Sequence, residues 1–414
     1  MPYANAPTVQ VLMALTAVIA LGWLLSHLFG RLGQPPVIGE VVAGIALGPS
    51  VLGRLSPETA DFLLPSSAAP FLGVIAQIGI IIYMFLVGLE LNLQAVRSQA
   101  RSIVAIACTG IVIPFALGAA LALQLPARLA GEVVLLSNFA LFMGVALAMT
   151  AFPVLARILA DGGMTKTPLG IMALACAALG DAIAWCLLAF VVGIAQAKVG
   201  GAVMIIVMTL AFVSFMFLVA RPLAVRVLAS QAPTRGVTAL VFVSLLASAL
   251  ATELIGIHAI FGAFVLGAII PHDSPIGREF PHKLEDLVTV LLLPAFFAFT
   301  GLRTQIGLVS TAEDWLICVG IIAVATVGKV GGTLLAARLI GQSWRDSAAL
   351  GILMNTRGLM ELIVLNIGLD LGVISPTLFA MMVLMALATT IATTPLLRLV
   401  GIQTMPQQRQ TPPA

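Results

Sequence analysis

The chain has 414 residues, of which 61% are hydrophobic and only 9% are charged, and its mean hydropathy is +1.15. A water-soluble domain carries about a quarter charged residues, so this composition excludes a soluble globular protein. The net charge of +3 gives no indication of a nucleic-acid partner, and the solvent of most of the chain must be the lipid bilayer.

The apolar stretches, taken in chain order, predict an all-α polytopic membrane protein with about 13 transmembrane helices. The stretches are too long and too uniformly apolar for the alternating strands of a membrane β-barrel. The first stretch lacks the preceding basic residues and the small-residue cleavage site of a signal peptide, so it is expected to be a span. The spans are expected near residues 8–29, 35–50, 70–90, 102–124, 133–160, 168–196, 199–220, 236–256, 258–271, 286–302, 314–337, 347–369 and 376–399.

Lys and Arg gather in alternate loops between these spans. By the positive-inside rule this distribution predicts an N-terminus outside and a C-terminus in the cytoplasm of a bacterial inner membrane.

The two halves of the chain resemble each other weakly. The aligned segments are 39–49 with 262–271, 85–90 with 299–303, and 149–155 with 354–360. Each pair is seven spans apart, an odd number, so the halves must have opposite orientations, as in inverted-repeat transporters. We therefore expect one transmembrane domain with repeats at about 8–196 and 236–400, a linker span at about 199–220, and no cytosolic regulatory domain. A chance recurrence of small-residue motifs is the alternative.

The fifth and twelfth spans look broken. Pro153 follows Thr150 in mid-span, and a proline removes one helical hydrogen bond. The matching place in the twelfth span holds Asn355, Thr356, Arg357 and Gly358. Unwound backbone at membrane depth is tolerated where it lines a cavity or is buried in protein, so the two breaks predict an ion site. Basic or polar side chains are then needed to balance the dipoles of the exposed helix ends.

Asp181 is the strongest candidate for the transported ion's ligand. It lies in the middle of an otherwise charge-free stretch, 167–197, where a carboxylate costs about 2.5–3.5 kcal/mol. Burial favours its neutral form, which suits a group that holds a proton in one state and a monovalent cation in the other. Gly180 beside it allows close approach of an ion or of another backbone. The alternative is a structural aspartate paired with a lysine.

Three further charges fall inside expected spans. Lys329 is a candidate partner for Asp181 or for the helix dipoles, with a structural role as plausible as a role in coupling. Arg357 and Glu361 are four residues apart on one helical face and are expected to pair with each other, chiefly to stabilise the broken helices.

Motifs for soluble chemistry are missing from the sequence. It contains no phosphate-binding glycine loop, no HExxH motif and no cysteine pair at metal-ligand spacing, so we expect neither an enzyme nor a bound cofactor. The energy source is then an ion gradient, unless the protein is a channel.

Four segments resemble the second monovalent cation:proton antiporter family, closest to its plant cation/proton exchangers and bacterial potassium-efflux branch. These segments are 148–160, 181–185, Gly328–Lys329 and 355–370. The resemblance implies a thirteen-span homodimer with a dimerisation domain and a mobile core that holds two crossed discontinuous helices. It also implies that Asp181 and Thr150 bind the cation and proton and that Lys329 is the basic residue of the eleventh span. Gly180 departs from the family, which usually has Asn, Gln or Asp there, and this removes a cation ligand or second proton carrier.

The function expected from these observations is exchange of a monovalent cation, K⁺ or Na⁺, for H⁺ through an alternately accessible site at Asp181. The lipid bilayer, the cation and the proton are the expected partners. The alternatives are a gated potassium-efflux pathway and a non-transporting membrane sensor.

Overall fold

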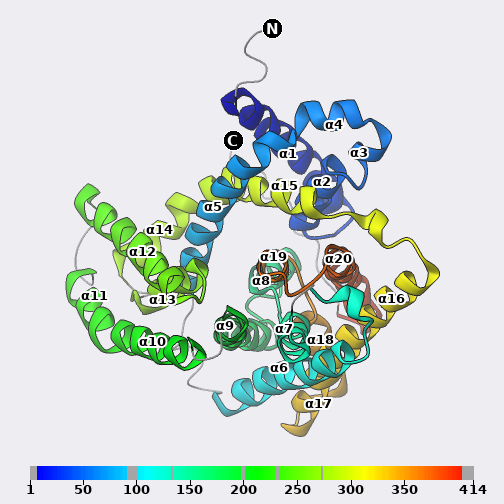
Figure 1. The fold of residues 1–414 in the computed structure, drawn as a ribbon. Coiled ribbons are helices and arrows are strands. Elements are labelled where there is room, and N and C mark those ends of the chain that lie inside the picture. The colour runs from blue at the N-terminus through cyan, green and yellow to red at the C-terminus, as the bar shows by residue number, and fades with distance from the viewer. Residues whose placement is uncertain are drawn as a thin grey trace, which may run out of the picture. The chain divides into compact units, whose positions relative to one another are not determined.

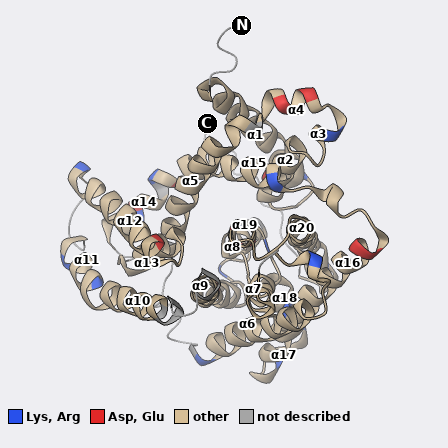
Figure 2. Cartoon of the chain, in the orientation of Figure 1, with Lys and Arg blue, Asp and Glu red and all other residues tan. Residues whose placement is uncertain are grey.

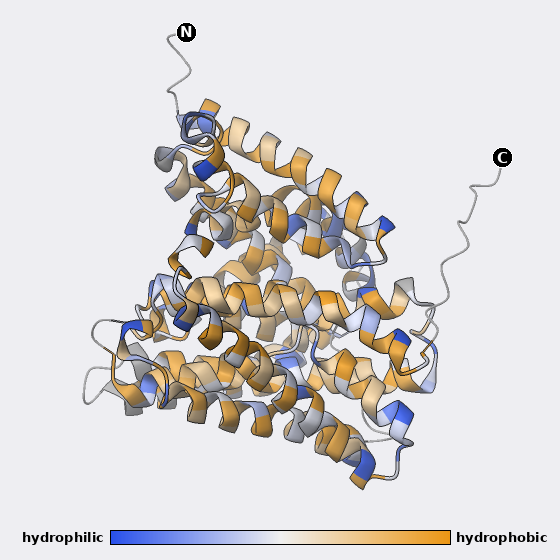
Figure 3. Ribbon diagram, turned by 90° about the vertical axis from the view of Figure 1, so that its right-hand side faces the viewer, coloured by the Kyte–Doolittle hydropathy of each residue, from blue (hydrophilic) through white to orange (hydrophobic). Residues whose placement is uncertain are grey.

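A computed structural model describes residues 7–90, 100–131, 134–196, 201–228, 234–271 and 274–402. The regular secondary structure of this part of the chain is helical apart from one isolated bridge between Ala130 and Ile374. Eleven of its helices are long and apolar enough to cross a membrane, or twelve if a bent helix pair forms one span. A shorter apolar helix, Ala259–Ile269, lies at the expected ninth span. The expected all-α polytopic fold is therefore confirmed, and the long hydrophobic stretches of the helices are visible in Figure 3. The first two residues of the expected linker span, 199 and 200, lie outside the described residues.

The chain divides into two compact units, each built from three stretches of sequence. Unit 1 comprises Met1–Trp23, Glu40–Gln94 and Trp185–Arg303, and unit 2 comprises Leu24–Gly39, Ala95–Ala184 and Thr304–Ala414. Helices α1, α2 and α9 each contribute to both units.

Unit 1 contains the first three spans and the seventh to tenth. Its helices are α1 (Pro7–Arg31, to Trp23), α2 (Pro36–Leu47, from Glu40), α3 (Leu52–Leu55), α4 (Pro57–Leu63), α5 (Ala69–Glu90), the end of α9, α10 (Gly201–Phe215), α11 (Arg221–Leu228), α12 (Arg235–Ile255), α13 (Ala259–Ile269), α14 (Pro275–Asp286) and α15 (Leu293–Arg303). One buried cluster in this unit joins Leu47, Leu72 and Ala298 of α2, α5 and α15.

Glycines bring two helix pairs of unit 1 into backbone contact. A Cβ atom added at Gly44 of α2 would lie 2.1 Å from the Phe297 carbonyl oxygen of α15, and one at Gly301 would lie 2.0 Å from the Gly44 carbonyl oxygen. The pair α5 and α13 is built in the same way, because a Cβ at Gly88 would lie 2.3 Å from the carbonyl oxygen of Phe264. No larger residue fits at these positions unless the helices separate, as in other close membrane-helix contacts.

The tenth span begins earlier than the expected residue 286. Helix α14 starts at Pro275 and continues through a π-helical segment, Leu287–Leu292, into α15. The charged residues of α14 suggested a loop, but Ser274 caps the helix by accepting a hydrogen bond from the Gly277 N–H at 3.0 Å.

Unit 2 contains the fourth to sixth and the eleventh to thirteenth spans (Figure 1). Its helices are α6 (Ala100–Ala122), α7 (Leu136–Ala148), α8 (Phe152–Asp161), α9 (Pro168–Gln196, to Ala184), α16 (Ala312–Thr326), α17 (Gly332–Leu339), α18 (Trp344–Met354), α19 (Leu359–Asp370) and α20 (Pro376–Leu399). A large apolar core includes Leu155 of α8, Ala177 of α9 and Leu353 of α18.

Charged residues gather near helix ends, which leaves the middle of most helices uncharged (Figure 2). The buried charged side chains of the described residues all belong to unit 2, and they are Asp181, Asp314, Lys329, Arg357 and Glu361. Asp314 lies in the first turn of α16, where it forms a capping box with Thr311. The other four lie around the two helix breaks.

Candidate functional site

Two spans of unit 2 are interrupted where the sequence predicted breaks. Helix α7 ends at Ala148 and α8 begins at Phe152, and Pro153 lies in the first turn of α8, where its missing N–H costs nothing. Helix α18 ends at Met354 and α19 begins at Leu359, with a bend of 44° between them.

The two breaks contact each other directly. The Thr150 hydroxyl donates a hydrogen bond to the Met354 carbonyl oxygen at 3.1 Å, and the Ala151 N–H donates to the Thr356 carbonyl oxygen at 2.9 Å. Backbone groups freed by one interruption are thus partly satisfied by the other, as a low-dielectric medium requires. Figure 1 shows the four half-helices, α7, α8, α18 and α19, gathered within unit 2.

The C-terminal end of α7 is capped by two cations. Arg357 donates to the carbonyl oxygens of Ala146 at 2.9 Å and Leu147 at 2.6 Å. Lys329 Nζ donates to the next carbonyl oxygen, that of Ala148, at 2.5 Å. These are carbonyls that have no partner inside the helix, at the negative end of the helix dipole. Both side chains therefore lie at the C-terminal end of α7 and donate to its last carbonyl groups.

Lys329 reaches this position from an irregular part of its own span. It lies in a five-residue π-helical segment, Val327–Gly331, between α16 and α17. Such single π turns inside α-helices are rare and often occur at functional sites. The only signal for this irregularity in the sequence is the pair of glycines, Gly328 and Gly331, on either side of the lysine.

Asp181 lies at the positive end of the other half-helix. Its Oδ2 accepts a hydrogen bond from the Phe152 N–H, the first of α8, at 3.3 Å. The residue is only 1% exposed, and Oδ1 has no hydrogen-bond partner among the described residues. A buried carboxylate thus presents one free oxygen at the N-terminus of α8, where the helix dipole favours negative charge.

Arg357 and Glu361 form the pair that their spacing suggested. Arg357 Nη1 donates to Glu361 Oε2 at 2.7 Å, and both side chains are almost fully buried. The main chain of Arg357 is held as well, because its N–H donates to the Thr390 hydroxyl at 2.8 Å and that hydroxyl donates to the Arg357 carbonyl oxygen at 2.7 Å. Sequence reasoning missed Thr390 of α20, although a threonine-rich stretch in an apolar helix was a visible signal.

The other two predicted residues of the second break are buried beside it. Asn355 follows the last residue of α18 as its C-cap, and its Oδ1 lacks a hydrogen-bond partner among the described residues. The Thr356 hydroxyl donates to the Leu353 carbonyl oxygen at 2.8 Å, which satisfies the end of its own helix. All seven residues expected at the site, including Thr150 and Asp181, therefore lie buried in unit 2.

Gly180 leaves room for a side chain next to Asp181. The nearest atom to a Cβ built there is the Met354 methyl carbon, Cε, at 4.0 Å, which is an ordinary van der Waals contact. Tight packing therefore does not explain this glycine, unlike Gly44, Gly88 and Gly301 of unit 1.

Among the residues that the structure describes, the site has no cluster of side chains suited to a resident multivalent metal. The described residues contain no group of three or more His, Cys, Asp or Glu side chains that could hold such an ion. The oxygen atoms at the breaks, from one carboxylate, hydroxyls and backbone carbonyls, are the donors that suit a hard cation.

Two broken helices that meet through their backbones, with a buried carboxylate and compensating cations, define a secondary transporter. The comparison with known proteins agrees with this class. Residues 14–399 match the family described as "Sodium/hydrogen exchanger, transmembrane", and the chain belongs to that family.

The chain is also similar to named antiporters along almost its whole length. The chain is 42% identical over 397 residues to the Na(+)/H(+) antiporter NhaS4 of Synechocystis sp., covering 93% of this chain and 96% of that protein. It is 41% identical to cation/H(+) antiporter 20 of Arabidopsis thaliana, over 91% of this chain, and 32% identical to K(+)/H(+) antiporter 1 of Saccharomyces cerevisiae, over 96%. It spans only 47% of the length of each of these last two proteins.

The fold is also found among solved structures. The sodium proton antiporter MjNhaP1 of Methanocaldococcus jannaschii superposes with a TM-score of 0.68, covering 95% of this chain and 100% of that one, at 16% identity. At this identity the similarity concerns the fold alone.

Proposed function

We propose that the protein is a secondary antiporter that exchanges a monovalent cation, K⁺ or Na⁺, for H⁺ at Asp181. The observation that carries the proposal is the Asp181 carboxylate, buried at the N-terminus of α8 with Oδ1 unpartnered. Its relatives support the proposal, since they are named as Na(+)/H(+), K(+)/H(+) and cation/H(+) antiporters.

Thr150 is proposed as a second cation ligand. Its hydroxyl hydrogen is directed to the Met354 carbonyl oxygen, so the oxygen keeps lone pairs that can bind a cation. Asp181 and Thr150 flank the same break and would together supply anionic and neutral oxygens. A single carboxylate binds either the proton or the cation, and a site that crosses only when neutralised exchanges one for one.

The fixed charges hold this site together. Arg357 and Lys329 neutralise the C-terminal end of α7, while Glu361 balances Arg357. We assign Arg357, Glu361, Asn355 and Thr356 to holding the crossed helices, and Lys329 to dipole compensation with a contribution to coupling. Electroneutral exchange follows as long as Lys329 keeps its charge throughout the cycle.

An inverted repeat accounts for the arrangement of the glycine contacts. The proposed repeat pairs α2 with α13 and α5 with α15. In unit 1 the contact of Gly44 with Gly301 is then the counterpart of the contact of Gly267 with Gly88. We further propose that the protein is a homodimer in a bacterial inner membrane, with its N-terminus outside and its C-terminus in the cytoplasm.

Proton movement in proteoliposomes tests the exchange function. Addition of Na⁺ or K⁺ to vesicles with an acidic lumen should release lumenal protons with the wild type and not with Asp181→Asn. Asp61→Asn, which removes an exposed carboxylate on α4, is the matched control and should transport normally. Wild-type vesicles that pass K⁺ without any proton movement would instead indicate a potassium pathway. No proton movement and no cation movement with either Na⁺ or K⁺ would contradict a transport function.

A further inference from the structure

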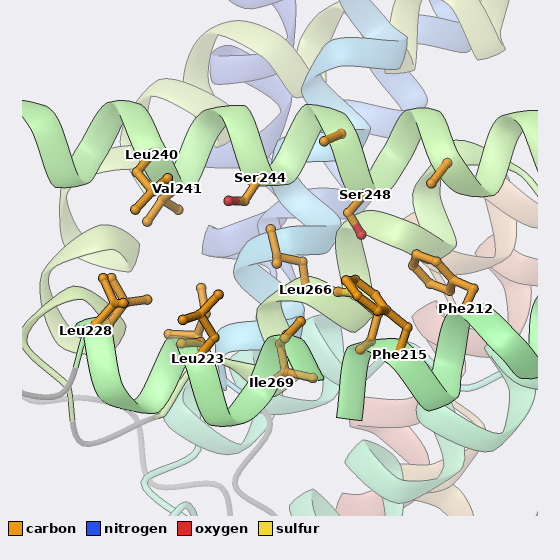
Figure 4. Close-up of a pocket in the computed structure, with 17 residues that line it drawn as sticks. Phe212, Phe215, Leu223, Leu228, Leu240, Val241, Ser244, Ser248, Leu266 and Ile269 are labelled. Atoms are coloured by element: carbon orange, nitrogen blue, oxygen red, sulfur yellow. The ribbon is translucent and has the colours of Figure 1, made fainter. Parts of the chain in front are cut away.

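Unit 1 contains an apolar cavity of about 400 Å³ that the proposed ion pathway does not use. It lies between the linker span, which comprises α10, the π-helical segment Met216–Ala220 and α11, and helices α12 and α13. Pockets that bind small ligands have volumes of about 300–1,000 Å³, so this cavity is large enough for an occupant. Figure 4 shows Leu228 and Leu240 at one end of the cavity and Phe212 towards the other.

The lining is unsuited to an ion or a polar solute. All lining side chains are apolar except Ser244 and Ser248. The Ser248 hydroxyl is already committed, because it donates to the Gly262 carbonyl oxygen at 2.7 Å. A polar molecule entering the cavity would lose its water without gaining partners, which is unfavourable. A hydrocarbon chain is the kind of occupant that matches this apolar lining.

The cavity is open on the exposed surface of these helices. Leu223 and Leu240 line it and are 58% and 49% exposed, and Phe215 is 55% exposed. In a membrane-spanning segment such exposed apolar side chains face lipid. The lining residues on α12 run from Leu240 to Ala251, which is about 16 Å at 1.5 Å per residue. That length is about half of the roughly 30 Å hydrocarbon core, or one leaflet.

Positive charge flanks the Leu228–Leu240 end. Arg226 lies on α11 between the lining residues Ala224 and Val227, and Arg235 begins α12, five residues before Leu240. Both side chains are exposed. The acidic residue of α10 to α13 within the described part of the chain is Glu253, which lies at the other end of α12 and accepts the Ala259 N–H at 2.7 Å. An anionic headgroup is therefore favoured at the Arg226 and Arg235 end.

We propose that this cavity binds one acyl chain of an anionic phospholipid, whose phosphate is held by Arg226 and Arg235. Guanidinium groups bind phosphate through paired N–H donors, whereas the apolar lining accepts the chain. The occupant packs between the linker span and α12, where the short side chains of Ala220, Ala224, Ala247 and Ala251 would otherwise permit close helix contact.

Photo-crosslinking in nanodiscs tests this site. A phosphatidylglycerol with a diazirine in its acyl chain is expected to label residues of α10 to α13. Unlabelled phosphatidylglycerol should compete at least about fivefold more effectively than phosphatidylcholine, a difference of about 1 kcal/mol. Ala247→Leu fills the cavity and should reduce labelling there at least fivefold. Ala239→Leu on the same helix, an exposed position outside the lining, should leave it unchanged.

Substitutions of surface arginines test the headgroup contact separately from the acyl-chain contact. The double variant Arg226→Gln/Arg235→Gln should abolish the preference for phosphatidylglycerol, while Arg54→Gln on α3 should preserve it. Equal competition by the two unlabelled lipids, or labelling that Ala247→Leu leaves unchanged, would overturn the proposal. Absence of lipid adducts on α10 to α13 would overturn it too. The gel-filtration profile of each variant reports folding independently of lipid binding.

Discussion

Replacing Arg357 by methionine should strongly destabilise the protein. In the structure this guanidinium donates to two terminal carbonyls of α7 at 2.9 and 2.6 Å and to Glu361 at 2.7 Å. Methionine keeps much of the apolar length but leaves those carbonyls and a buried carboxylate without their donor. Breaking a buried ion pair from one side costs about 3–5 kcal/mol, and we expect Arg357→Met to fall in this range.

The partner substitution should cost much less. In Glu361→Gln the amide oxygen still accepts a hydrogen bond from Arg357, and Arg357 still donates to both carbonyl oxygens of α7. We therefore expect the free energy of unfolding to fall by about 1–2 kcal/mol. The double variant Arg357→Met/Glu361→Gln removes the uncompensated buried carboxylate. It should therefore be more stable than Arg357→Met alone by at least about 1 kcal/mol.

Reversible unfolding in mixed detergent micelles measures the free energy of unfolding of all four proteins as a double-mutant cycle. Arg101→Met, at the exposed start of α6, is the matched control and should change little. A loss below about 1 kcal/mol for Arg357→Met would refute the assignment of Arg357 as the central support of the crossing. So would losses that simply add in the double variant.

Four further substitutions have clear expectations in the same assay. Gly88→Ala forces α5 and α13 apart and should cost about 1–3 kcal/mol, with an unchanged stability as the contrary result. Gly180→Ala adds a Cβ that makes only an ordinary van der Waals contact with Met354, and it should instead gain about 0.5–1 kcal/mol, so a clear loss would show that the space beside Gly180 is needed. Thr390→Val leaves the buried Arg357 N–H unpaired and should cost about 1–3 kcal/mol, and no loss would mean that water replaces the hydroxyl. Arg128→Ala removes ion pairs to Glu313 and Asp314 at a half-exposed position, and its small effect should disappear at high salt, whereas a salt-independent loss would point to packing instead.

Much of the architecture was determined by the sequence alone. A span must be about 20 apolar residues long, and a buried charge is expensive. The distribution of apolar and charged residues along the chain therefore located most of the spans and singled out Asp181, Lys329, Arg357 and Glu361. Pro153 likewise marked the break after α7, because a proline removes a helical hydrogen bond wherever the chain places it.

The partners of these groups were decided only by the tertiary structure. Lys329 could have paired with Asp181 or with a helix dipole, and the fold brings its Nζ to the Ala148 carbonyl oxygen, 181 positions away in the chain. The role of Thr390 and the cavity beside the linker span depend in the same way on segments that are distant in sequence. Hydrophobicity is a local property that a sequence displays directly, whereas a hydrogen bond requires two atoms within about 3 Å, and only the packed helices set that distance.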